Sequence, residues 1–231
     1  HGTGSRHIEY NPDDRFSLSS SYVTCSFVDN NEGVWLGTKD SGVNWSGIAQ
    51  MNFEKYYTAS GTSLEGCIVS GFCEESPTKV WVSTDQAGFL LWNPVNATVE
   101  RVKIPGIPRT VCSPCIDGNS LWFGSLSGVY KLDIKTLALK HYGGIMRDSG
   151  RKDQKVYLVY KTKKGDIYAG TTLGLSRYNR EKDCFEDVKS IDGVFVTSIA
   201  EDAEGNMWLS TFSSGLYRWN PSDGEMLHFT Q

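Results

Sequence analysis

Five copies of one unit follow each other along the chain, and this repeat restricts the fold more than any other feature. Each copy holds an aromatic residue, two small or apolar residues and a Ser or Thr: Trp35–Thr38, Trp81–Thr84, Trp122–Ser125, Tyr168–Thr171 and Trp208–Thr211. A glycine follows in every copy, at Gly42, Gly88, Gly128, Gly174 and Gly215. The period is roughly 40–46 residues, which is typical of architectures whose units bury their faces against one another.

The last copy shows the pattern within a unit most clearly. Short runs with strand-like composition are expected at 196–201, 206–210, 215–219 and 226–230, separated by turn residues such as Glu204-Gly205. No stretch has sustained helical periodicity. Four strands per unit predict an all-β chain, a β-propeller with five four-stranded blades. A pair of β-sandwiches is the alternative, but it does not require the same aromatic residue in every unit.

We expect the repeated aromatic residue to pack between neighbouring blades. Four copies carry a second large residue four positions after the glycine, and we expect the same role for these residues: Trp92, Leu132, Tyr178 and Trp219. The first copy differs, because Ser46 occupies this position and Trp45 lies one place earlier.

The repeat also predicts the domain organisation. Residues 6–231 form the propeller, with units near 22–65, 66–109, 110–155, 156–195 and 196–231. Residues 6–10 match the outer strand of a preceding unit, and 1–5 resemble a purification-tag remnant, so we expect a piece of a longer protein. The five blades either close on themselves or belong to a larger ring. Exposed blade faces favour closure or a partner.

The composition and motifs exclude several functions. The chain of 231 residues has 23 Lys and Arg against 27 Asp and Glu, a net charge of −4, which argues against nucleic-acid binding. Cys112 and Cys115 form a single CxxC pair without the partners of a zinc site. His7, His141 and His228 fall at outer-strand positions. We therefore expect no catalytic residues, no metal site, no cofactor and no enzymatic activity.

Two stretches carry a family resemblance. Residues 196–211 with 214–220, and residues 17–23 with 33–38 and 41–45, resemble the regulator-propeller repeat of hybrid two-component system sensors. The resemblance extends over essentially the whole chain after the tag, although the second and third units are degenerate.

This resemblance implies a fragment of the periplasmic sensor of an inner-membrane protein, with a histidine kinase and response regulator outside this chain. It implies seven-bladed rings, so the five units would be part of one ring, joined to the remaining blades and the signalling domains. The implied ligand is an oligosaccharide, and signalling can involve a homodimer. A carbohydrate-active propeller enzyme (a lyase or glycosidase) and a protein-interaction platform are the alternatives.

Loops at one face of the blades are expected to bind the ligand, because function in such folds lies on loops. These are the turns from second to third strand (39–41, 85–87, 126–127, 172–173 and 212–214) and the connections 59–65, 105–109 and 143–155. Aromatic platforms and planar polar groups bind sugars. The candidate ligand-binding residues are therefore Trp45, Asp85, Arg109 and Phe212.

Overall fold

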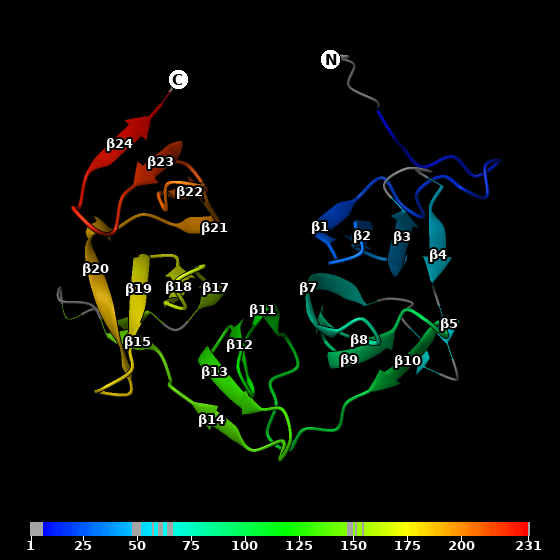
Figure 1. Cartoon of the computed structure of the whole chain (residues 1–231), viewed down its shortest axis with the longest axis horizontal. Helices are drawn as coiled ribbons and strands as arrows, with labels where there is room; N and C mark the ends of the chain where they lie inside the picture. Colours follow the sequence, from blue (N-terminus) through cyan, green and yellow to red (C-terminus); the bar gives the residue numbers. More distant parts are fainter. Residues whose placement is uncertain are drawn as a thin grey trace. The chain divides into compact units, whose positions relative to one another are not determined.

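The computed structural model describes residues 7–47, 52–56, 58–59, 62–63, 67–146, 150, 152–153 and 155–230. Throughout these residues the regular secondary structure is β-strand, as predicted, and the strands form five four-stranded antiparallel sheets. Figure 1 shows the four strands of each sheet side by side in chain order. These sheets are the blades of a β-propeller fold, numbered here 1 to 5. The expected tag remnant at 1–5 lies outside the described residues.

The chain divides into two compact units, His1–Lys103 and Ile104–Gln231, called unit 1 and unit 2. Unit 1 contains blades 1 and 2. Blade 1 consists of β1 (Val23–Val28), β2 (Gly33–Thr38), β3 (Val43–Gly47) and β4 (Glu54–Tyr56). Blade 2 consists of β7 (Ile68–Ser76), β8 (Lys79–Asp85), β9 (Gly88–Asn93) and β10 (Thr98–Arg101). A small hairpin, β5 (Thr58–Ala59) with β6 (Thr62–Ser63), lies between the two blades in the chain.

Unit 2 contains the other three blades. Blade 3 consists of β11 (Cys112–Asp117), β12 (Ser120–Ser125), β13 (Gly128–Asp133) and β14 (Leu139–His141). Blade 4 consists of β17 (Val156–Lys161), β18 (Ile167–Thr171), β19 (Gly174–Asn179) and β20 (Cys184–Asp192). Blade 5 consists of β21 (Val196–Glu201), β22 (Met207–Thr211), β23 (Leu216–Trp219) and β24 (Met226–Phe229). A second hairpin joins β15 (Ile145–Met146) to β16 (Lys152–Asp153).

Residues 7–10 lie before the first blade. Tyr10 forms a single parallel bridge with Leu18, and residues 7–9 belong to no strand. An outer strand of a preceding unit would need that unit's third strand as its partner, so the assignment of 6–10 stays a prediction.

Three of the five repeated aromatic residues, Trp35, Trp122 and Tyr168, pack between blades, as the sequence predicts. In unit 1, Trp35 is 1% exposed and lies edge-on to Trp92 of blade 2, with ring centroids 5.8 Å apart. In unit 2, Trp122 packs on Tyr178 at 4.6 Å, and Tyr168 lies edge-on to Trp219 at 6.0 Å. The first aromatic residue of one blade thus meets the third-strand aromatic residue of the next. Burial of such large rings supplies much of the driving force for folding.

Trp208 of blade 5 has a different environment. It is half-buried and stacks on Phe229 of its own outer strand, with ring centroids 5.8 Å apart. Phe229 remains 45% exposed, and its neighbours Met226 and Leu227 are also exposed. This side of blade 5 therefore presents apolar surface to solvent.

Candidate functional site

Three aromatic residues lie together at the strand ends of blades 4 and 5, and we call them the aromatic platform: Tyr157, Phe195 and Phe212. The rings of Phe195 and Phe212 are nearly parallel, with centroids 5.5 Å apart, and Phe195 lies 5.0 Å from Tyr157. Phe212 is 75% exposed, a large fraction for a phenylalanine. An exposed aromatic surface of this kind is suited to stacking against a ligand.

The strand register explains how the two phenylalanines meet. Val196 at the start of β21 pairs with Thr211 at the end of β22. Phe195 and Phe212 are the next residues beyond this pair, and the backbone N–H of Phe212 donates to the carbonyl oxygen of Phe195 at 3.0 Å. The two side chains are thus held on the same end of the blade.

Every inner strand carries a register shift near its start. A hydroxyl-bearing residue lies at each shift: Thr24, Ser70, Ser113, Tyr157 and Thr197. In unit 2, the Ser113 hydroxyl donates to the carbonyl oxygen of Tyr157 at 3.2 Å. Bulges of this kind re-aim side chains and are common beside binding sites. Tyr157 therefore belongs both to the aromatic platform and to this set of hydroxyl groups.

Unit 1 has a related arrangement in blade 1. The backbone N–H of Lys39 donates to the carbonyl oxygen of Tyr22 at 3.2 Å, as Phe212 does to Phe195. The Lys39 ammonium lies 5.3 Å from the centroid of the Tyr22 ring. Blade 1 thus has a cation–π pair where blade 5 has two stacked rings.

The four predicted ligand-binding residues lie in different places. Asp85 is half-buried at the end of β8, where the turn to β9 begins, and Arg109 is exposed before β11. Trp45 lies on β3 opposite Trp35 and lines a pocket on the side of blades 1 and 2 that carries the β1–β2 and β7–β8 turns. Asp85 lies at the opposite end of the blade 2 strands. Phe212 is the predicted residue that joins an aromatic cluster, and its own ring is exposed.

Sequence reasoning missed Phe195 and Tyr157. Both lie at the start of inner strands, outside the repeated aromatic–Ser/Thr motif. Phe195 directly precedes Val196, a position that alignment of the five units by their first strands would have singled out.

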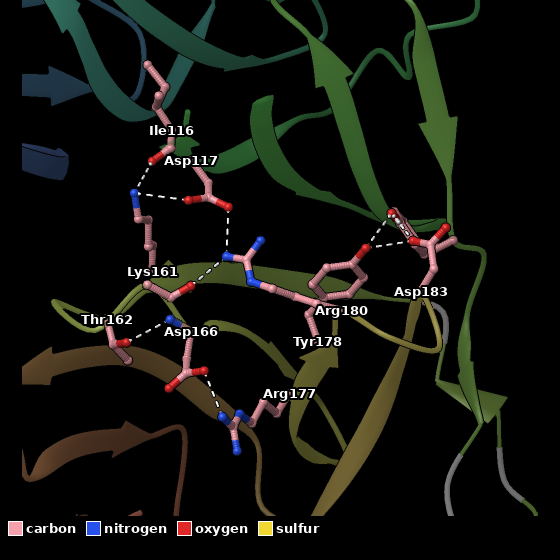
Figure 2. Close-up of polar contacts among 11 residues, drawn as sticks. Ile116, Asp117, Lys161, Thr162, Asp166, Arg177, Tyr178, Arg180 and Asp183 are labelled. Atoms are coloured by element: carbon pink, nitrogen blue, oxygen red, sulfur yellow. Dashed lines mark hydrogen bonds and ion pairs between the residues drawn. The ribbon is translucent and has the colours of Figure 1, made fainter. Parts of the chain in front are cut away.

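Charged side chains in unit 2 join blades 3 and 4 (Figure 2). Asp117 of β11 accepts from Arg180 at 2.8 Å and lies 3.3 Å from the Lys161 ammonium, which also donates to the Ile116 carbonyl oxygen. Burial opposes ionisation of Asp117, but hydrogen bonds from Arg180 and Lys161 outweigh it and lower its pKa. These charges are satisfied within the protein, so the network has a structural role.

A second polar cluster in Figure 2 is centred on Asp183, which has a left-handed backbone with φ of 52°. Its carboxylate accepts from the hydroxyl groups of Tyr178 at 2.6 Å and Tyr142 at 2.8 Å, and it pairs with Lys140. The hydrogen bonds from Lys140, Tyr178 and Tyr142 hold the Asp183 pKa well below its usual range. The cluster ties the outer part of blade 3 to the β19–β20 turn.

Two histidines and one cysteine, whose side chains could in principle act in acid–base or nucleophilic chemistry, are held by contacts within the blades. His141 and His228 lie on outer strands, as predicted, and stack on Tyr130 and Tyr217 at 4.2 and 4.0 Å. None of the six cysteines, all of which lie in the part of the chain that the structure describes, forms a disulfide. Burial raises the pKa of Cys112 to about 12, so its thiol is not a nucleophile at neutral pH.

The described residues contain no group of three or more His, Cys, Asp or Glu placed to hold a metal ion. No helix in this part of the chain is long and apolar enough to cross a membrane.

Comparisons with known proteins agree with the fold. Residues 190–213, which include Phe195 and Phe212, match the family model "Two component regulator propeller". No curated protein matches the sequence significantly.

Several solved structures have similar folds. The extracellular domain assigned to the hybrid two component system BT4673 from B. thetaiotaomicron is 22% identical to this chain, with a TM-score of 0.74. The match covers 96% of this chain and 29% of the BT4673 chain. The corresponding domain of BT3049 from the same organism is 18% identical, with a TM-score of 0.79 over 97% of this chain and 31% of its own. The WD40 β-propeller domain of Doa1 is 17% identical, with a TM-score of 0.64. The match covers 85% of this chain and 62% of the Doa1 chain.

At these identities the likeness shows the fold, and the chain spans less than a third of the length of the first two relatives. The family match and the five blades together support the resemblance noted in the sequence. The chain carries a two-component regulator propeller repeat, at residues 190–213, within a β-propeller fold.

Proposed function

We propose that this chain is part of the extracytoplasmic sensor of a two-component signalling protein, and that its aromatic platform binds an oligosaccharide. The observation that carries the proposal is the exposed ring of Phe212, which stacks on the half-buried Phe195 beside Tyr157. The apolar C–H face of a sugar ring can lie on such a surface, and the nearby hydroxyl groups of Tyr157 and Thr197 offer hydrogen bonds.

The comparisons support a sensor rather than an enzyme. The matched repeat is that of two-component regulators, and the two B. thetaiotaomicron neighbours are extracellular domains of hybrid two-component systems. In this proposal the chain lies in the periplasm, as part of an inner-membrane protein whose remaining blades and histidine kinase are outside this sequence. Ligand binding would then be relayed to that kinase, with a homodimer as the signalling form.

A thermal-shift screen against oligosaccharides from plant and host glycans tests the proposal. A ligand at 100 times its Kd stabilises the folded state by about 2.7 kcal/mol. For a chain of this size the midpoint would rise by roughly 5–10 °C. We expect a saturable shift with one glycan class, and its loss in Phe212→Ala.

Phe229→Ala is the matched control, because Phe229 is also an exposed phenylalanine of blade 5 but lies on the outer strand. Arg109→Ala and Asp85→Asn test the two polar candidates. A shift that persists in Phe212→Ala would place the sugar elsewhere, and a folded protein that responds to no glycan would contradict the proposal.

A further inference from the structure

Unit 1 contains a pocket of about 190 Å³ between the turns of blades 1 and 2. Aromatic side chains of Trp35, Trp45 and Tyr56 line it, together with three carboxylates, those of Asp29, Glu54 and Glu74. None of the described residues lining the pocket is Lys, Arg or His. The pocket therefore combines aromatic walls with an uncompensated negative charge.

The repeat provides an internal comparison for Asp29. In three blades a carboxylate accepts the indole N–H of the first tryptophan, at 2.7 Å for Asp29, 2.8 Å for Glu75 and 3.0 Å for Asp202. Glu75 lies 3.5 Å from the Lys79 ammonium, and Asp202 lies 4.0 Å from the Arg218 guanidinium. No described cation forms an ion pair with Asp29 within 4.0 Å. Blade 1 therefore lacks the positive charge that accompanies this carboxylate in blades 2 and 5.

In blade 5 this positive charge belongs to Arg218 on the third strand, and the strand register identifies the equivalent residue in the other blades. Opposite the first aromatic residue of blades 3, 4 and 5, the third strand carries Lys131, Arg177 and Arg218. Arg177 pairs with Asp166 at 2.7 Å, and the Lys131 ammonium lies 5.1 Å from the Trp122 ring. The corresponding residue of blade 1 is Trp45, opposite Trp35. In blade 1 an aromatic ring thus occupies the position that holds a cationic side chain in blades 3 to 5, whereas blade 2 has Leu91 there.

Two polar atoms of the pocket residues are buried without a hydrogen-bond partner: Nε1 of Trp45 and Oε1 of Glu74. The other oxygen of Glu74 accepts the backbone N–H of Asn30 at 3.1 Å. A carboxylate oxygen that is buried and unpaired is costly, because it has lost its hydration. A donor or a positive charge brought by a ligand would compensate this cost.

We propose that this pocket binds an organic ammonium group, which takes the place of the missing cationic side chain. The rings of Trp45 and Tyr56 provide cation–π surface, and the carboxylates of Asp29, Glu54 and Glu74 provide the opposite charge. The inference is independent of sugar binding at the aromatic platform, because the two sites lie in different units.

Calorimetric titration with choline tests this inference, with 3,3-dimethylbutan-1-ol as a neutral probe of the same shape. We expect saturable choline binding and at least tenfold weaker binding of the neutral alcohol. Equal binding of the two probes would show an apolar pocket without charge recognition. Absence of choline binding to the folded protein would likewise overturn the proposal.

Two substitutions locate the site. Trp45→Arg restores the cation that blade 5 has at this position, so we expect it to abolish choline binding. Glu54→Gln keeps the size of the side chain and an acceptor for the Tyr56 hydroxyl, which donates to Glu54 at 2.6 Å, while removing one charge. We expect roughly three- to tenfold weaker binding in Glu54→Gln. Phe212→Ala, in unit 2, is the control and should bind choline as the unsubstituted protein does; unchanged binding in both pocket variants would contradict the proposed location.

Discussion

Asp202 shows how a single carboxylate organises a blade. Its oxygens accept the backbone N–H groups of Glu204 and Asn206, the Asn206 side-chain amide and the Trp208 indole N–H. These hydrogen bonds close the turn between β21 and β22 and fix the tryptophan. The bonds from Asn206 and Trp208 and from the turn backbone lower the pKa of Asp202 to about 2.

This lowered pKa predicts a specific pH dependence. The folded state favours the ionised form of the Asp202 carboxylate. Its contribution to stability is therefore complete above the ordinary aspartate pKa of about 4, and it is lost as the pH falls toward the lowered pKa of about 2. Asp202→Asn removes this contribution at neutral pH. Urea unfolding at neutral pH and near pH 2 should therefore show a smaller loss of stability on acidification for Asp202→Asn than for the unsubstituted protein. Parallel losses would contradict the prediction.

Turn carboxylates of this kind are easier to infer from the sequence than the candidate binding residues are. Acidic residues recur with the repeat, so their turn-forming role can be inferred. Phe195, Tyr157 and the placement of Trp45 opposite Trp35 do not recur. Their significance depends on which side chains the strand register brings together, and that becomes visible only when the blades are aligned.

The turn between the second and third strands is the element with the strictest backbone requirement. Gly174 has a φ of 138°, and a Cβ at this position would overlap the carbonyl oxygen of Ile191. Gly215 occupies the same position in blade 5, with a φ of 75° and a similar overlap with Phe229. The repeat therefore conserves space for the outer strand as well as a turn conformation.

We expect Gly174→Ala to destabilise the protein by more than about 1 kcal/mol, because alanine introduces both the overlap and an unfavourable φ. Gly47→Ala is the control, since no atom of the described residues lies within 4 Å of a Cβ built there. Thermal unfolding of the two variants measures the difference. Equal midpoints would show that the turn relaxes to accept a side chain.

Aromatic packing between neighbouring blades also stabilises the strands, as Trp92 shows. Trp92 is 1% exposed and contacts both Trp35 and Tyr56, with centroid distances of 5.8 and 4.3 Å. Trp92→Ala should lower the free energy of unfolding by about 3–5 kcal/mol, the usual cost of deleting a buried tryptophan. Val95→Ala, at a side chain that is 76% exposed, should have little effect. Chemical denaturation of both variants tests this contrast.

The strands of the last blade match their predicted ranges to within a residue, because turn residues and aromatic positions bracket each of them. The hairpins β5–β6 and β15–β16 were not predicted. Their strands have two residues each, too few for any periodicity to appear.

At the scale of the whole molecule, a repeated unit made the fold predictable. Each blade needs a neighbour to cover its faces, so one motif specifies both the strands and their packing. The repeat explains the fold but not the function, because the repeated residues form the core and the candidate binding residues are exceptions to the repeat. The aromatic platform of unit 2 and the acidic aromatic pocket of unit 1 are two such exceptions.

Binding of an oligosaccharide at the aromatic platform is the central proposal, and calorimetric titration tests it most directly. The glycan with the largest thermal shift would be titrated into the unsubstituted protein, Phe212→Ala and Phe229→Ala. We predict at least tenfold weaker binding in Phe212→Ala and unchanged binding in Phe229→Ala. The size follows by analogy with a nucleobase stacked on an aromatic side chain, a contact that contributes about 1–3 kcal/mol. Equal affinity in all three proteins would contradict the proposal.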